Sequence, residues 1–396
     1  MSIINSILDL DQYKLSMQQA VLELFPDVDV EYRFKNRGIH RFTHEFVEAL
    51  RREIISLKEL SLTEEEYNWL KKNFTFFKPQ YLEYLKNYRF NPKEVEFNLT
   101  PGNNLELKIK GKWHSTILFE TILLSIISEL YFKYIDTNWN YEGQEEKAKE
   151  KIKKLSENGC LFADFGTRRR RSYETQDLVV KIFCEFQKEF NEKYFVGTSN
   201  VLLAYKYNSY GIKAIGSVGH EWIQGTQILN SLNFCNYYAM ENWIKVYSNV
   251  EIGTALTDTV GVDAFLKDFN RKQSMLYPSI RHDSGCPFKF IDKIIKHYEK
   301  MEINPQEKTI IFSDGLNVNS AIEIRKKCEG RIKCSFGIGT HFSNDFQESP
   351  ALNIVIKLWS VNNQFTVKLS DIEGKENGDP EMVKIMKYII KQKINS

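Results

Sequence analysis

From residue 160 onward, short apolar segments alternate with amphipathic ones, and this alternation constrains the fold more than any other feature of the sequence. The apolar segments are rich in β-branched and aromatic residues, and they span residues 160–166, 194–199, 213–220, 251–258, 277–285, 308–315, 332–340 and 352–359. The segments between them have helical periodicity, as in residues 173–190, 262–275, 288–301 and 318–327. Strands that alternate with helices predict βαβ units and a parallel sheet.

Seven of these apolar segments carry a polar residue or glycine at their carboxyl end: Asp164, Thr198, His220, Asp258, Asp283, Asp314 and Gly337. A parallel α/β barrel builds its active site from the carboxyl ends of many strands, whereas a doubly wound sheet concentrates its site at one switch point. The pattern therefore favours an α/β barrel. The alternative, that Gly and Asp simply terminate strands, explains one or two endings better than seven.

The first third of the chain has a different, mixed character. Helical patterns span residues 11–24, 42–60 and 64–73, and a strand pattern spans residues 28–36. Residues 94–100 and 104–110 predict a hairpin around Pro101 and Gly102. The charged segment 141–155 predicts a solvated helix. The sequence thus predicts a mixed α/β region ahead of the barrel.

The composition excludes several classes of protein. Lys and Arg number 54 against 52 Asp and Glu, which argues against a nucleic-acid-binding protein. The apolar segment 117–132 contains two glutamates and is too short to span a bilayer, so it predicts a buried helix and no membrane association. The six cysteines form no C-x-x-C pair, and the N-terminus lacks the features of a signal peptide. A cytoplasmic enzyme is expected.

The most distinctive segment runs from Ala163 through Asp164-Phe165-Gly166-Thr167 to four consecutive arginines at 168–171. Guanidinium groups that follow a strand can bind phosphate oxygens through planar, bidentate hydrogen bonds. Arg168, nearest to the strand end, is the predicted substrate contact. A solvated basic turn is the favoured interpretation for the other three arginines.

Three further segments carry candidate chemistry. In Arg281-His282-Asp283-Ser284-Gly285, the Asp283 carboxylate could hold ribose hydroxyls or magnesium while Arg281 neutralises phosphate, and a plain ion pair at a turn is equally compatible. Glycine-bearing strand ends offer backbone N–H groups to phosphate, or are ordinary turns; they contain Ser313, Asp314, Gly315, Gly337, Gly339 and Thr340. His220 could act as a base or a nucleophile, although a satisfied histidine at a helix start is commoner.

Taken together and in order, these segments resemble the nicotinate phosphoribosyltransferases over nearly the whole chain. The shared motifs are DQYKL (11–15) with MQQA (17–20), DFGTRRRRS (164–172), FVGTSN (195–200), GHEW (219–222), ALTDT (255–259), RHDSG (281–285), FSDGL (312–316), SFGIGT (335–340), LNIVIKL (352–358) and KLSD (368–371). The resemblance implies a type II phosphoribosyltransferase fold. An N-terminal α/β domain, residues 1–140 joined by 352–396, would pack on an irregular, incompletely closed barrel of residues 155–351.

The resemblance also implies an activity and roles for individual residues. Nicotinate and phosphoribosyl pyrophosphate would be joined with release of pyrophosphate, in NAD salvage, with Mg²⁺ and with ATP hydrolysis coupled to synthesis. Phe165 and Tyr13 match the two aromatic residues that stack on the pyridine ring, Tyr13 from the partner subunit of a homodimer. Arg168, Arg281 and the glycines at 315, 337 and 339 match phosphate contacts, and Asp283 matches the carboxylate near the ribose. Thr198, Ser199 and Asn200 match positions that contact the substrate's carboxylate or amide, and His220 matches the histidine that ATP phosphorylates.

The sequence departs from the family pattern at two positions. Cys286 stands where a second carboxylate often follows the DSG triplet, which puts magnesium affinity in doubt. His341 stands where a basic residue often follows the glycine strand, and it would be only partly charged at neutral pH. Three alternatives are a nicotinamide phosphoribosyltransferase, a quinolinate phosphoribosyltransferase and a catalytically silent relative. Residues 197–200 lack the aspartate that would receive a carboxamide, which favours nicotinate.

Overall fold

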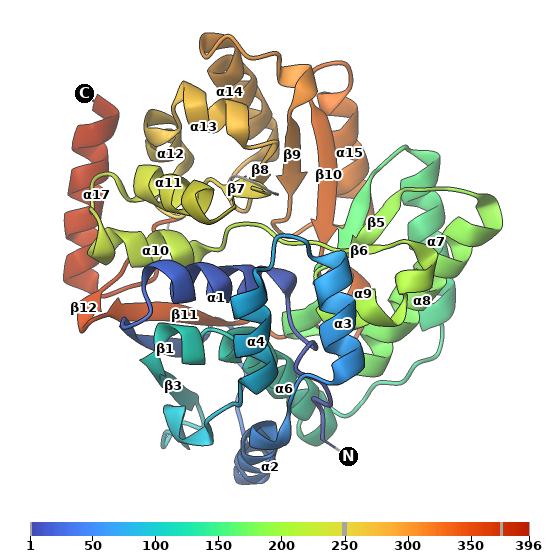
Figure 1. Cartoon of the computed structure of the whole chain (residues 1–396). Helices are drawn as coiled ribbons and strands as arrows, with labels where there is room; N and C mark the ends of the chain where they lie inside the picture. The colour runs from blue at the N-terminus through green and yellow to red at the C-terminus, as the bar shows by residue number, and fades with distance from the viewer. Residues whose placement is uncertain (1, 248–251, 373–374, 396) are drawn as a thin grey trace.

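The computed structural model describes residues 2–247, 252–372 and 375–395, and its strands form two separate sheets (Figure 1). The larger sheet has seven strands in the order β6-β5-β4-β10-β9-β8-β7, and all of its pairings are parallel. Its strands are β4 (Phe162–Asp164), β5 (Phe195–Thr198), β6 (Lys213–Ala214), β7 (Thr254–Leu256), β8 (Ser279–His282), β9 (Thr309–Phe312) and β10 (Lys333–Ile338). Glu251, where one predicted segment begins, lies outside the described residues.

This sheet curls into an incompletely closed barrel, which confirms the predicted fold class. β6 and β7 are its edge strands. The segment after β6 crosses the opening between them, and the Val218 N–H donates to the carbonyl of Thr254 in β7 over 3.0 Å. The same segment leads directly into the helix that begins at His220. The gap in the barrel therefore places His220 beside the carboxyl ends of the strands.

The smaller sheet is antiparallel, in the order β12-β11-β1-β3-β2. Its strands are β1 (Asp29–Asn36), β2 (Val95–Leu99), β3 (Leu105–Lys112), β11 (Ile354–Val361) and β12 (Gln364–Phe365). β11 comes from the last apolar segment of the sequence and pairs with β1, from Asn36↔Ile354 to Val30↔Val361. The predicted hairpin is confirmed as β2 and β3. The C-terminal part of the chain is thus built into the N-terminal sheet.

Helices cover both sheets and fill the space between them. They are α1 (Gln12–Leu24), α2 (His44–Ser56), α3 (Glu64–Asn73), α4 (Pro79–Asn87), α5 (Trp113–Thr116), α6 (Phe119–Tyr134), α7 (Gln144–Glu157), α8 (Tyr173–Phe190), α9 (Val201–Lys206), α10 (His220–Leu229), α11 (Cys235–Tyr247), α12 (Val262–Asp268), α13 (Arg271–Leu276), α14 (Pro287–Lys300), α15 (Val318–Cys328), α16 (Thr340–Ser343) and α17 (Pro380–Asn395). α1 and α10 lie between the antiparallel sheet and the barrel (Figure 1), and α10 contacts β11.

Two of these helices bear on predictions from the sequence. The segment Trp113–Tyr134 is long and apolar enough to cross a membrane, but 89% of its most apolar window is buried inside the protein, so it is the core helix that was expected. The single helix predicted over residues 262–275 is instead broken into α12 and α13. Asn270 interrupts it, because its side chain accepts a hydrogen bond from the Gln273 N–H and caps α13.

Candidate active site

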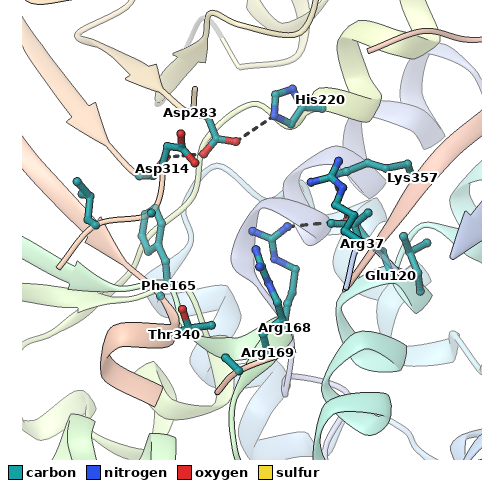
Figure 2. Close-up of a pocket in the computed structure, with 18 of the residues that line it drawn as sticks. Arg37, Glu120, Phe165, Arg168, Arg169, His220, Asp283, Asp314, Thr340 and Lys357 are labelled. Carbon is teal, nitrogen blue, oxygen red and sulfur yellow. Dashed lines mark hydrogen bonds and ion pairs between the residues drawn. The ribbon is translucent and has the colours of Figure 1, made fainter. Parts of the chain in front are cut away.

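A cavity of about 540 Å³ lies between the carboxyl ends of the parallel strands and the antiparallel sheet. It gathers most of the residues singled out in the sequence: Tyr13, Phe165, Arg168, His220, Arg281, Asp283, Ser313, Asp314, Gly315, Gly339 and Thr340. Figure 2 shows His220, Asp283 and Asp314 on one side of this cavity and Arg37 and Lys357 on another. The strand-end residues converge because parallel strands present their carboxyl ends at one edge of the sheet.

His220 is the first residue of α10 and faces the cavity. Its Nδ1 lies 2.8 Å from Thr259 Oγ1, and its Nε2 lies 3.0 Å from Asp283 Oδ2 and 2.7 Å from Lys368 Nζ. Burial, together with the nearby Lys368 ammonium, lowers the pKa of His220 to about 4. The ring is therefore neutral at pH 7, which leaves one nitrogen with a free lone pair and the chemistry of a nucleophile.

Asp283 directly follows β8, and it joins three other side chains of the site. Arg281 Nη2 donates to Asp283 Oδ1 over 2.8 Å, and Ser313 Oγ donates to the same oxygen over 2.8 Å. Burial opposes ionisation, but Arg281, His220 and Lys368 outweigh it and hold the pKa of the Asp283 carboxyl well below its usual range. Arg281 and Asp283 therefore form the predicted ion pair. Both residues line the cavity, where the ionised Asp283 carboxylate can accept hydrogen bonds from hydroxyl groups.

The two cations at the start of the arginine run, Arg168 and Arg169, line the cavity. Arg168 Nε lies 3.3 Å from Asp11 Oδ2, which orients its guanidinium. Burial, Arg168 and Arg37 lower the pKa of Arg169 to about 10, so three guanidinium groups repel one another in this part of the cavity. Such a cluster favours the binding of an anion, because an anion relieves the repulsion.

Arg170 and Arg171 are fully buried, so the predicted solvated turn is wrong for both. Arg170 makes two hydrogen bonds to Asp9, of 2.7 and 2.8 Å, and one of 2.7 Å to Glu129. The Arg171 guanidinium stacks 3.5 Å from the centroid of the Phe132 ring. Arg170 fastens the loop after β4 to the N-terminal region, and Arg171 fastens it to Phe132 and, by hydrogen bonds, to Asn344 and Ser349. The two arginines before them reach the cavity.

Phe165 lies in the cavity wall directly after β4, and the Arg281 guanidinium lies 5.9 Å from its ring centroid. Gly337 leaves room for this ring, since a Cβ at position 337 would lie 2.3 Å from Phe165 Cδ2. Gly337 does not line the cavity among the described residues, unlike Gly339 and Gly315. Gly337 therefore accommodates Phe165, and its contact to phosphate stays a prediction.

Tyr13 lines the cavity of its own chain, where its hydroxyl donates to Glu120 over 3.2 Å. The family resemblance implies that this tyrosine contributes to the site of a neighbouring subunit. Within the single chain that the structure describes, Tyr13 and Phe165 lie in the wall of one cavity. The contribution of Tyr13 to a neighbouring site stays a prediction.

Thr198, Ser199 and Asn200 are buried behind the cavity wall and bind other parts of the protein. Thr198 Oγ1 donates to Asp164 over 2.7 Å, and Ser199 Oγ donates to Asp11 over 2.6 Å. Asn200 caps α9 and donates to Asp9. Among the described residues these three do not line the cavity, so this geometry favours a supporting role over the direct substrate contact that remains a prediction.

Several residues that line the cavity were not predicted to be site residues, notably Arg37, Glu120, Lys357 and Lys368. Lys357 lies on β11, within the LNIVIKL motif, and Lys368 begins the KLSD motif. Burial lowers the pKa of Lys357 to about 7, although the nearby Glu120 opposes this shift. In the sequence, both lysines could be noticed only because they lie within family motifs, and no functional role had been assigned to those motifs.

His341 and Cys286, the two positions that depart from the family pattern, differ in their exposure to solvent. Burial, with Lys151 close by, lowers the pKa of His341 to about 4, so His341 lines the cavity as a neutral ring. It can offer a hydrogen bond to a phosphate but no charge. Cys286 is exposed and stands before Pro287, the first residue of α14.

Comparison with known proteins is consistent with this geometry. The model of the nicotinate phosphoribosyltransferase (NAPRTase) family matches residues 160–393, and the model of its N-terminal domain matches residues 8–128. The chain is 51% identical to the nicotinate phosphoribosyltransferase of Methanosarcina mazei, over 98% of this chain and 99% of that protein. The chain belongs to the nicotinate phosphoribosyltransferase family.

Solved structures of the nicotinate phosphoribosyltransferase family have the same fold. The enzyme from Porphyromonas gingivalis superposes with a TM-score of 0.93 at 40% identity, over 98% of this chain and all of that one. A putative nicotinate phosphoribosyltransferase from Saccharomyces cerevisiae superposes with a TM-score of 0.93 at 39% identity, over 99% of each chain. The expected fold and family are therefore confirmed.

Proposed function

We propose that the chain joins nicotinate to phosphoribosyl pyrophosphate, releases pyrophosphate, and couples this synthesis to ATP hydrolysis in NAD salvage. The observation that carries the proposal is the neutral His220 hydrogen-bonded to Asp283, in one cavity with Arg281 and Phe165. Membership of the nicotinate phosphoribosyltransferase family supports the reaction itself. A cytoplasmic location fits the buried apolar helix and the composition.

Each wall of the cavity suits one part of the reaction. Phe165 and Tyr13 offer ring faces to the pyridine, and Arg281 beside Phe165 offers a cation to its carboxylate. The pyridine nitrogen attacks C1 of the ribose while the pyrophosphate departs. Positive charge develops on the ribose, so the ionised Asp283 stabilises it when hydrogen-bonded to the ribose hydroxyls. The guanidinium cluster of Arg37, Arg168 and Arg169, together with Lys357, balances the negative charge of the departing pyrophosphate.

His220 serves the coupling to ATP. Its neutral ring can attack the γ-phosphorus of ATP and hold the phosphoryl group, and its place at the start of α10 favours added negative charge. Asp283 links this histidine to the ribose site, because its two carboxylate oxygens contact His220 and Arg281. Phosphorylation of His220 would therefore alter the charge around the residue that binds the ribose.

Magnesium would be held by carboxylates of this same cluster. Ligand atoms of His220, Asp258 and Asp283 all lie within 4.8 Å of one another, and the buried Asp258 Oδ1 has no hydrogen-bond partner within the described ranges. Oxygen ligands of this kind suit Mg²⁺, which also binds phosphate oxygens and would neutralise the charge on pyrophosphate. Cys286 adds no carboxylate to this group.

We expect nicotinate to be used in preference to nicotinamide by about 10²-fold or more in kcat/KM, because cavity cations that pair a carboxylate stay unpaired beside an amide. The measurement is a product assay that offers nicotinate, nicotinamide and quinolinate in competition. Comparable kcat/KM for nicotinate and nicotinamide would overturn the substrate assignment. Absence of any product with all three would instead indicate a silent relative.

The variant His220→Asn is expected to retain slow, ATP-independent synthesis and to lose stimulation by ATP. Asparagine keeps a polar side chain at the start of α10 but offers no nucleophile. The wild type should take up label from γ-labelled ATP in an acid-labile, base-stable bond, and the variant should not. ATP stimulation that survives in His220→Asn would exclude this histidine as the phosphorylated residue.

The oligomeric state remains a proposal, with a homodimer expected from the family resemblance, but the cavity of one chain already contains Tyr13 and Asp283. We therefore expect that mixing the inactive variants Tyr13→Ala and Asp283→Ala restores no activity beyond the sum of their residual rates. Exchange of subunits is verified with differently tagged chains. Activity that returns on mixing would show that Tyr13 acts in a neighbouring subunit.

A further inference from the structure

We propose that Lys368 is a further catalytic residue, which holds the γ-phosphoryl group of ATP as it is transferred to His220. The proposal rests on the assignment of His220 as the phosphorylated residue. Lys368 Nζ lies 2.7 Å from His220 Nε2, and the Lys368 side chain lines the cavity. No other ammonium or guanidinium group among the described residues forms a hydrogen bond or ion pair with this ring.

The backbone around Lys368 is held in place by the same elements that hold His220. Lys368 and Asn377 exchange two backbone hydrogen bonds, of 2.8 and 2.9 Å. The next residue, Leu369, donates its N–H to the carbonyl of Thr259 over 2.8 Å, and the Thr259 hydroxyl contacts His220 Nδ1. The lysine is therefore built into the site, because its segment and the imidazole share a partner. A surface lysine that reached the ring by chance would have no such support.

The ring nitrogen beside Lys368 has two neighbours with opposite requirements. Asp283 Oδ2 can only accept a hydrogen bond from Nε2, whereas the Lys368 ammonium can only donate to it. One nitrogen cannot do both at once, so the two neighbours favour different tautomers. Ribose hydroxyls that donate to Asp283 would leave Lys368 as the partner of Nε2. The proton then lies on Nδ1, and Thr259 Oγ1 accepts the hydrogen bond from this N–H group.

A cation at this position offsets part of the negative charge of the cluster. Arg281 pairs with Asp283, and Lys368 lies 3.7 Å from Asp258. Two carboxylates are thus balanced by two cations around the neutral ring of His220. A phosphoryl group would bring further negative charge close to both carboxylates. Lys368 is near enough to turn from Nε2 to a phosphoryl oxygen and offset that charge.

The Nε2 lone pair forms a bond to the γ-phosphorus, and the bond from this phosphorus to the β–γ bridging oxygen breaks. ADP leaves with that electron pair. Nδ1 keeps its proton, so the phosphorylated ring carries a positive charge beside Asp258 and Asp283. Lys368 keeps all of its protons and moves its hydrogen bond from nitrogen to the transferred group.

The test uses the full chain and γ-labelled ATP, with Lys368→Met as the variant. We expect labelling of the protein to slow by about 10²-fold, since a charged donor to the transferring group is lost. Far-ultraviolet circular dichroism verifies that the variant folds. Lys384→Met, which removes an exposed lysine of α17, is the control and should label at the wild-type rate.

Two further variants make the outcome decisive. Lys368→Gln retains an amide donor for Asp258 if the methionine variant does not fold, and it should label as slowly. Lys368→Arg retains the charge and should keep most of the labelling rate. Wild-type labelling in either neutral variant would overturn the proposal for Lys368 and leave His220 unaffected. A wild-type protein that takes up no label would overturn both assignments.

Discussion

Replacement of Asp283 by alanine is expected to lower kcat/KM by about 10²-fold or more while leaving the protein folded. The carboxylate lies at the centre of the site, where it accepts hydrogen bonds from Arg281 and Ser313 and faces His220. It stays ionised at neutral pH because Arg281, His220 and Lys368 lower its pKa, so its loss removes a charge that stabilises the developing oxocarbenium ion. Steady-state turnover with saturating nicotinate and varied phosphoribosyl pyrophosphate measures the effect.

A matched aspartate outside the cavity controls for this change. Asp263 is the second residue of α12 and forms an exposed ion pair with Lys293, so Asp263→Ala should leave turnover unchanged. The kinetic pattern adds a second criterion. If the carboxylate acts mainly on the transition state, kcat should fall at least as much as KM rises. A folded Asp283→Ala protein with near-normal turnover would disprove the assignment to the ribose.

Replacement of Arg170 by methionine is expected to lower the free energy of unfolding by about 3–5 kcal/mol. The arginine is fully buried, and its removal would leave the carboxylates of Asp9 and Glu129 without their cation. Burial already raises the pKa of Glu129 to about 7 although Arg170 opposes the shift. Urea unfolding followed by fluorescence and by circular dichroism measures the change in midpoint.

An exposed arginine provides the comparison for Arg170. Arg331 pairs with Asp292 at the surface over 2.7 Å, and Arg331→Met should cost less than about 1 kcal/mol because water screens such a pair. Equal effects of the two substitutions would contradict the role of Arg170 as a buried anchor. The folded Arg170→Met protein should also bind phosphoribosyl pyrophosphate more weakly, since the loop that carries Arg168 and Arg169 is fastened through it.

The part of the site that strand ends provide could be predicted from the sequence. Asp283 comes directly after β8 and Phe165 directly after β4, so the rule that parallel strands present their carboxyl ends together was enough to group them. The arginine run shows where that local reasoning ended. Residues adjacent in sequence point in different directions after a strand, and only the tertiary contacts separate the two buried arginines from the two in the cavity.

The lysines of the opposite wall could not be predicted for a related reason. Lys357 reaches the cavity because β11 pairs with β1, and that pairing joins segments that are far apart in the sequence. Lys368 depends on the shared contact with Thr259. The family resemblance identified the motifs that contain both residues, but a motif carries no information about which wall of the cavity its side chains will face.

The pairing of β11 with β1 also determines when during synthesis the protein can become active. A chain on the ribosome would already contain His220, Arg281 and Asp283 before residues 354–361 emerged. It would lack Lys357 and Lys368, and β1 would have an unpaired edge. Without Lys368, the phosphorylation of His220 by ATP would be slow in an unfinished molecule. We therefore expect ATP-dependent labelling to reach its full rate only after the last part of the chain has been inserted beside the first strand.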